Sequence, residues 1–156
     1  MLGKIAINGR ANKVKTAFRL EYSAGINIKA KPHRVWELMT NAGDFPRWNS
    51  TIKSIEGTIA AGKTIKLVAT ISAGRVFNLN IIEFLPEKRM VWSDGSAMFK
   101  GVRTYTMEPK PDGTTDFTMA EVYTGLMLPM IAGSLPDFGP VFEQYLSDLK
   151  REAERV

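Results

Sequence analysis

The sequence contains no cysteine and a single histidine, His33. The lack of cysteine excludes disulfide bonds, thiol nucleophiles and thiolate metal ligands. One imidazole cannot form a multi-histidine metal site, and a catalytic triad would depend on that residue alone. His33 follows Pro32 at the start of a predicted helix, which is a surface position. We therefore expect no catalytic role for His33, no metal site and no cofactor.

Long hydrophobic runs are also missing. The longest apolar stretches are far shorter than the roughly 18 residues that a membrane span requires. The N-terminus carries basic residues but has neither the continuous apolar segment nor the cleavage-like site of a signal peptide. These features predict a cytoplasmic protein without integral membrane association.

Acidic residues are absent from the first twenty positions, although the net charge of the whole chain is only +5. The bases that precede the first acid, Glu21, are Lys4, Arg10, Lys13, Lys15 and Arg19. This segment is either an arm attracted to anionic surfaces or a solvated extension. Elsewhere bases and acids are interspersed without a nucleic-acid motif, so we expect no nucleic-acid partner. We divide the chain into a basic extension, residues 1–16, and a single ligand-binding domain, residues 17–156.

The hydrophobic periodicity changes along the chain. Residues 17–29 alternate apolar and polar and predict a long strand, with Gly25 as a bulge. Pro32 suits the first turn of a helix, and a short turn or helix follows at 44–49. Six further segments have the two-residue period of strands, and they are 51–55, 64–71, 75–84, 89–92, 97–108 and 115–125.

The last thirty residues have helical periodicity. The apolar stripe consists of Val141, Phe142, Tyr145, Leu146, Leu149 and Ala153. Pro136 and Pro140 predict a break between about 133 and 140, after which Asp137 is a candidate cap. Strands segregated from helices predict an α+β fold in which a seven-stranded antiparallel sheet curves around the C-terminal helix.

The Asp112-Gly113 turn fixes a register for the last hairpin. The resulting cross-strand pairs are Arg103–Glu121, Tyr105–Met119 and Met107–Phe117. All six side chains then point to one face, and their apolar content places that face toward the helix. Buried charges are rarely left unpaired, so Arg103 and Glu121 are predicted to form a salt bridge. This pair either contacts a ligand or a substrate, or fixes strand register, or faces water if the register is wrong.

Five methionines are concentrated within the C-terminal half of the chain, at Met98, Met107, Met119, Met127 and Met130. Flexible thioether side chains suit either a variable apolar ligand or ordinary core packing. Tyr105 and Tyr123 would add hydroxyl groups to an apolar wall. Phe45 is a candidate cover for the cavity mouth, and Trp92 belongs either to the core or to the cavity.

Several short segments together resemble a known family. The segments are AKPHRVWELM (30–39), DFPRWN (44–49), MVW (90–92), RTYTMEP (103–109), DGTT (112–115), EVYTGLMLP (121–129) and LKREAE (149–154). In order and spacing, across residues 20–155, they resemble the SRPBCC superfamily and within it the polyketide cyclase/dehydrase and lipid-transport-like branch. The resemblance implies a START-like helix-grip fold with a hydrophobic cavity between the sheet and the last helix.

The resemblance and the face assignment together give a set of candidate ligand-binding residues. They are Arg103, Tyr105, Met107, Met119, Glu121, Tyr123, Met130, Phe138, Phe142, Phe45 and Trp92. The expected partner is a small apolar or amphipathic molecule that resembles a lipid, a polyketide or an aromatic compound. Three functions remain open: a binding or carrier protein, a cyclase or dehydratase acting in the same cavity, and a co-chaperone-like interaction module. The sequence leaves the oligomeric state open between monomer and dimer.

Overall fold

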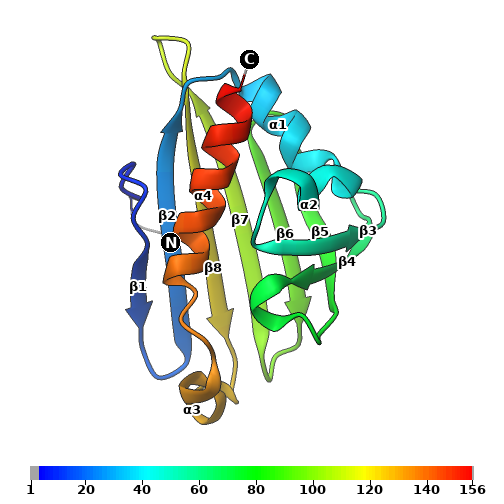
Figure 1. The fold of residues 1–156 in the computed structure, drawn as a ribbon. Coiled ribbons are helices and arrows are strands. Elements are labelled where there is room, and N and C mark those ends of the chain that lie inside the picture. Colours follow the sequence, from blue (N-terminus) through cyan, green and yellow to red (C-terminus); the bar gives the residue numbers. More distant parts are fainter. Residues whose placement is uncertain (1–3, 156) are drawn as a thin grey trace.

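The computed structural model describes residues 4–155, which form one antiparallel sheet crossed on one face by a long helix (Figure 1). The strands are β1 (Asn12–Lys15), β2 (Arg19–Ile28), β3 (Ile52–Glu56), β4 (Thr64–Ala69), β5 (Phe77–Leu85), β6 (Arg89–Gly95), β7 (Lys100–Pro109) and β8 (Thr115–Thr124). The helices are α1 (Pro32–Thr40), α2 (Phe45–Trp48), α3 (Leu128–Ile131) and α4 (Gly139–Glu154). Short 3-10 turns occupy Ala42–Asp44, Thr70–Ser72 and Ala132–Ser134. No helix within 4–155 is long and apolar enough to span a membrane.

The strands are arranged in the order β1-β2-β8-β7-β6-β5-β4-β3, with every neighbouring pair antiparallel. Connections therefore alternate between the two ends of the sheet. The β1–β2, β4–β5, β6–β7 and β8–α3 connections share one end, which we call the α3 end and which lies at the bottom of Figure 1. The α+β class and the curved antiparallel sheet around a C-terminal helix are thus confirmed.

The sheet has eight strands, one more than the seven predicted. The additional strand is β1, which lies inside residues 1–16, the segment that we predicted as an extension. Residues 1–3 of that segment fall outside the described part of the chain. It pairs with β2 from Asn12 opposite Ser23 to Lys15 opposite Leu20. All four residues of β1 are exposed, so no buried apolar side chain marks it as a strand.

Gly25 does not form the bulge that we predicted. It pairs with Thr118 in an uninterrupted register between β2 and β8. The chain before β1 passes over it instead, and the N–H of Gly9 donates to the carbonyl oxygen of Gly25 at 2.8 Å. A Cβ at position 25 would lie 2.9 Å from the carbonyl oxygen of Ala6, so this close approach requires glycine.

The predicted break before the last helix is confirmed. Pro140 lies in the first turn of α4, where its missing N–H is not needed. Asp137 accepts a hydrogen bond from the N–H of Gly139 at 3.0 Å, although the residue at the cap position itself is Phe138. The segment between β8 and α4 is therefore a chain of short turns across the α3 end.

The apolar stripe of α4 packs onto the inner, concave face of the sheet. Phe142 and Tyr145 are buried there against Tyr22 of β2 and Tyr105 of β7, and Leu149 is buried in the same core. Asp148 is also buried, and it accepts hydrogen bonds from the backbone N–H and the hydroxyl of Ser50 at 2.8 and 2.7 Å. This carboxylate fixes α4 to the chain between α2 and β3.

Candidate functional site

The β7–β8 hairpin has the register that the Asp112-Gly113 turn predicted. Arg103 lies opposite Glu121, and the next inward-facing pairs are Tyr105–Met119 and Met107–Phe117. Arg103 Nε donates to Glu121 Oε2 at 2.9 Å, which confirms the predicted ion pair. Both side chains belong to the concave face, because Tyr105 in the same row of β7 is buried beneath α4.

The surroundings of the ion pair are apolar and aromatic. The guanidinium carbon of Arg103 lies 5.1 Å from the ring centroid of Phe142 on α4, within cation–π range. Burial raises the pKa of Glu121, and the positive charge of Arg103 only partly opposes this effect. Burial acts to lower the pKa of Arg103, but Glu121 outweighs it and the pKa of Arg103 is raised. Each charge therefore offsets part of the cost of burying the other.

Three tyrosine hydroxyl groups lie in the same region. Tyr145 on α4 donates to the hydroxyl of Tyr105 at 3.4 Å. Tyr123 stacks between Phe99 and Phe138, with ring centroids 5.7 and 5.8 Å away. Burial raises the pKa of all three phenols, so they remain neutral hydrogen-bonding groups.

The space beneath the middle of α4 is filled by side chains. Trp92, Tyr105, Phe117, Phe142 and Tyr145 are all fully buried there. Trp92 packs edge-on against Tyr105, with ring centroids 5.1 Å apart. The expectation of an open cavity at this place is therefore not met by residues 4–155 in this conformation.

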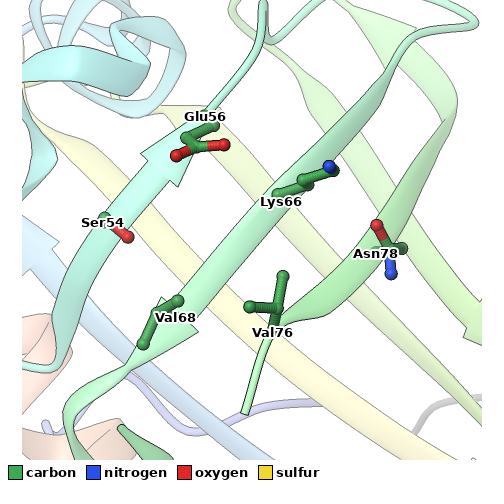
Figure 2. Close-up of a pocket in the computed structure, with 6 residues that line it drawn as sticks. All are labelled: Ser54, Glu56, Lys66, Val68, Val76 and Asn78. Carbon is green, nitrogen blue, oxygen red and sulfur yellow. The ribbon is translucent and has the colours of Figure 1, made fainter. Parts of the chain in front are cut away.

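Two hollows of the described chain lie elsewhere. One, of about 410 Å³, is an open depression on the outer face of the sheet, lined by Ser54, Glu56, Lys66, Val68, Val76 and Asn78 (Figure 2). The other, of about 280 Å³, lies between β1, β2 and the start of α4, next to Tyr22. The outer depression is separated from the Arg103–Glu121 pair by the sheet itself.

The ion pair lies at the border of the filled region. The side chains of Arg103 and Glu121 keep 20% and 12% of their surface exposed, whereas the neighbouring Tyr105 keeps 1%. Toward the α3 end, several apolar side chains that pack on the core are only partly buried, and they include Phe77, Leu79, Phe99, Leu135 and Phe138. We call the group Arg103, Glu121, Tyr123, Phe138 and Phe142 the Arg103 site.

Most of the candidate ligand residues face the concave side, but two lie elsewhere. Met107 and Met119 are buried in the core, as is Trp92. Phe45 is 0% exposed and packs on Trp48 at 5.0 Å, so it belongs to the core and not to a cavity mouth. Met130 is 78% exposed, because the single turn of α3 buries Leu128 and turns Met130 outward.

The sequence reasoning missed one residue near the site. Asp94 lies in β6 opposite Gly101, and burial raises its pKa. Its position two residues after Trp92 would have indicated the concave face. The indole nitrogen of Trp92 is buried without a hydrogen-bond partner among the described residues, so it is an unused donor beside the aromatic interior.

Within residues 4–155, no group of three or more histidine, cysteine, aspartate or glutamate side chains is placed to hold a metal ion. The arrangement can offer a guanidinium, a carboxylate and phenol hydroxyls to a molecule that is otherwise surrounded by aromatic rings.

Comparison with known proteins agrees with this architecture. A family described as polyketide cyclase/dehydrase and lipid transport matches residues 19–154. No curated protein matches the chain.

Solved structures match over nearly the whole length. A hypothetical protein from Helicobacter pylori shares 13% identity over 99% of both chains, with a TM-score of 0.70. A protein from Rhodobacter sphaeroides shares 21% identity over 91% of this chain and 96% of its own, with a TM-score of 0.64. A START superfamily protein from Mycobacterium smegmatis shares 16% identity over 86% of this chain and 97% of its own, with a TM-score of 0.63. At these identities the likeness establishes the START-like fold.

Proposed function

The chain belongs to the polyketide cyclase/dehydrase and lipid transport family, and from this premise we propose that it binds a small, mostly apolar ligand at the Arg103 site. The hydrophobic part of the ligand lies against the aromatic rings beneath α4. Its polar group meets Arg103, Glu121 and the hydroxyl of Tyr123. A site of this kind, mostly apolar with a few convergent polar groups, is typical of small-molecule binding.

The observation that carries the proposal is the half-buried Arg103–Glu121 pair on the concave face. Burying two charges costs several kcal/mol per ion, and well-packed apolar residues often serve stability as well or better. Within 4–155, the salt bridge to Glu121 is the only one that Arg103 makes, and it uses Nε. The guanidinium carries five N–H donors, so it retains donors for a carboxylate, carbonyl or hydroxyl group of a ligand.

Access to this site requires movement, because the interior is filled. The segment that covers the site on the α3 end runs from Gly125 to Phe138 and consists of one helical turn, a 3-10 turn and extended chain. Phe138 closes it by packing edge-on against Tyr22 at 5.6 Å and stacking on Tyr123 at 5.8 Å. In the proposal, the ligand displaces Phe138 and occupies the space between Tyr123 and Phe142.

Native mass spectrometry of protein purified from cells tests the proposal directly. A retained small molecule that is lost when the protein is unfolded is the expected result. The absence of any retained mass, together with no binding of apolar fluorescent probes, would contradict the proposal. That outcome would favour an interaction module, whose interior needs no ligand.

A second candidate, an enzyme of the cyclase or dehydratase kind, is favoured by one observation. Burial raises the pKa of Glu121, and a carboxyl group with a raised pKa can exchange a proton with a bound substrate. If the retained molecule is converted on incubation with the purified protein to a dehydrated product or to an isomer that chromatography separates, and Glu121→Gln stops the conversion while retaining the molecule, this candidate replaces simple binding. A molecule unchanged in both mass and chromatographic retention over the same period supports a carrier.

A further inference from the structure

Large apolar side chains are exposed at the α3 end. They are Phe18, Ile71, Val76, Met98, Leu126, Met127 and Met130, and we call them the α3-end patch. Leu126 and Met130 are the most exposed, at 67% and 78%. They come from the four connections of the α3 end, which lie in the lower half of Figure 1, so residues far apart in sequence lie toward the same end of the sheet. An exposed apolar set of this kind indicates a surface that meets an apolar partner.

Backbone contacts hold the centre of the patch together. The N–H of Met127 donates to the carbonyl oxygen of Met98 at 2.9 Å, so the β6–β7 and β8–α3 connections lie side by side. Gly125 permits this approach with φ of +135°, and a Cβ there would lie 2.3 Å from the oxygen of Met98. Met130 lies next to these two residues, because its N–H donates to the carbonyl oxygen of Met127 at 3.1 Å.

Basic residues surround these apolar tips. Arg19 on β2 and Lys100 on β7 both pair with Thr124, the last residue of β8. They therefore lie side by side across the sheet, at the strand ends next to the patch. Lys15 ends β1 at the same edge, opposite Leu20. Arg75, in the β4–β5 connection, lies with its guanidinium carbon 4.6 Å from the ring centroid of Phe77.

The charges near this end leave a positive excess. Glu21 is bonded to Arg19 at 2.9 Å, so this pair adds no net charge. Asp94 faces the concave side. Asp137 is exposed and negative, whereas Lys15, Arg75 and Lys100 are exposed and form no salt bridge with other residues of 4–155. Three bases against one exposed acid make the surface around the apolar tips positive.

From this arrangement we propose that the α3 end is a docking surface for an anionic lipid bilayer. The apolar tips enter the headgroup region, while Lys15 and Lys100 lie at the level of the lipid phosphates. The tips come from four connections, and three of them are methionines, whose flexible side chains suit a soft hydrocarbon layer. The inference concerns a surface outside the Arg103 site and stands whether or not that site binds a ligand.

Vesicle flotation tests the docking surface, using the full chain with vesicles of phosphatidylcholine alone or mixed with phosphatidylglycerol. The informative variant is Leu126→Ser with Met130→Ser. The matched control is Ile82→Ser with Leu85→Ser, which removes apolar side chains of similar exposure, 60% and 47%, from β5. We expect the parent chain and the control to bind the mixed vesicles, and the patch variant to bind at least about tenfold more weakly.

A second set of measurements tests whether binding requires the positive charges. Lys15→Gln with Lys100→Gln should weaken binding to the mixed vesicles, and added salt should do the same to the parent chain, because both reduce attraction to the anionic surface. Absence of vesicle binding by the parent chain, or equal loss in the patch variant and its control, would overturn the proposal. Light scattering that shows a dimer abolished by the patch variant would also overturn it, since the partner would then be a second copy.

Discussion

The hydroxyl oxygens of Tyr145 on α4 and Tyr105 on β7 lie 3.4 Å apart, beneath the middle of the helix. Their rings are nearly parallel, with centroids 6.0 Å apart. The helix and the sheet are therefore in direct contact at the centre of the concave face. Space for a ligand has to come from the side of Arg103 and Phe138, where burial is incomplete.

Tyr145→Phe should lower the free energy of unfolding by about 1 kcal/mol, the usual net value of a neutral hydrogen bond. The aromatic ring stays in place, so the packing against Trp48 and Tyr105 is retained. Urea denaturation of the parent and the variant measures the difference. A loss above about 3 kcal/mol would show that the hydroxyl belongs to a larger network than these contacts indicate.

Asp148→Ala should be more damaging, with a loss of about 2–4 kcal/mol. Asp148 is 1% exposed, and its removal leaves the N–H and hydroxyl of Ser50 without their acceptor. Ser147→Ala, at an exposed position of the same helix, is the control and should stay within about 0.5 kcal/mol of the parent. Equal effects of the two substitutions in urea denaturation would refute this role of Asp148.

The carboxylate of Glu152 should give the protein an acid-dependent part of its stability. The hydrogen bond from Arg47 at 2.7 Å, aided by Arg155, lowers the pKa of Glu152 below its ordinary value of 4.5. A lowered pKa in the folded state stabilises the protein above the unfolded value, and the effect is lost as the pH falls through the folded value. Glu152→Gln should therefore be less stable than the parent at neutral pH.

The same comparison at lower pH provides the check. The difference between Glu152→Gln and the parent should shrink steadily below about pH 4.5, as the carboxylate of the parent becomes protonated. Thermal unfolding followed by circular dichroism at several pH values measures it. A difference that stays constant across this range would contradict the assigned cause.

Gly125→Ala should destabilise the junction between β8 and α3. Its φ of +135° is strained for any residue with a Cβ, and the new atom would meet the carbonyl oxygen of Met98 at 2.3 Å. We expect a loss of about 1–3 kcal/mol. Gly133→Ala is the control, because nothing lies within 4 Å of a Cβ there. If both substitutions have the same effect on the melting temperature, the geometry described at the α3 end is wrong.

The sequence predicted the sheet best where turn chemistry and alternation agree. Asp112-Gly113 fixed the register of β7 and β8, and with it the pairing of Arg103 and Glu121. Pro136 and Pro140 located the break before α4 because proline has a strict backbone requirement. These features depend on local residues alone, which is why they can be predicted.

Other features depend on contacts that no local pattern encodes. β1 has only exposed side chains and is held by backbone hydrogen bonds to β2. Gly25 is needed for a segment that crosses it from earlier in the chain. Met130 and Phe45 lie on single-turn helices, which are too short for periodicity to show the buried face. The filling of the concave face depends on side-chain volumes and rotamers across three strands and α4. The alternation of polar and apolar residues therefore predicts which side chains point to this face, but it does not predict how much space they leave free.

The central claim, that Arg103 and Glu121 hold the polar group of an apolar ligand, is tested most directly by replacing both. Arg103→Met alone would leave Glu121 half-buried without its partner and endanger folding. The double variant Arg103→Met with Glu121→Met removes both charges and should fold as stably as the parent. Arg89→Met with Glu83→Met is the matched control, since that ion pair, at 3.0 Å, is exposed.

Isothermal titration with the molecule retained in native mass spectrometry, or with an amphipathic fatty-acid probe if the retained molecule is scarce, compares these proteins. We predict that the control binds like the parent and that the Arg103/Glu121 double variant binds about ten to a hundred times more weakly, the value of one or two charge-assisted hydrogen bonds. A folded double variant that binds with the affinity of the parent would contradict the account.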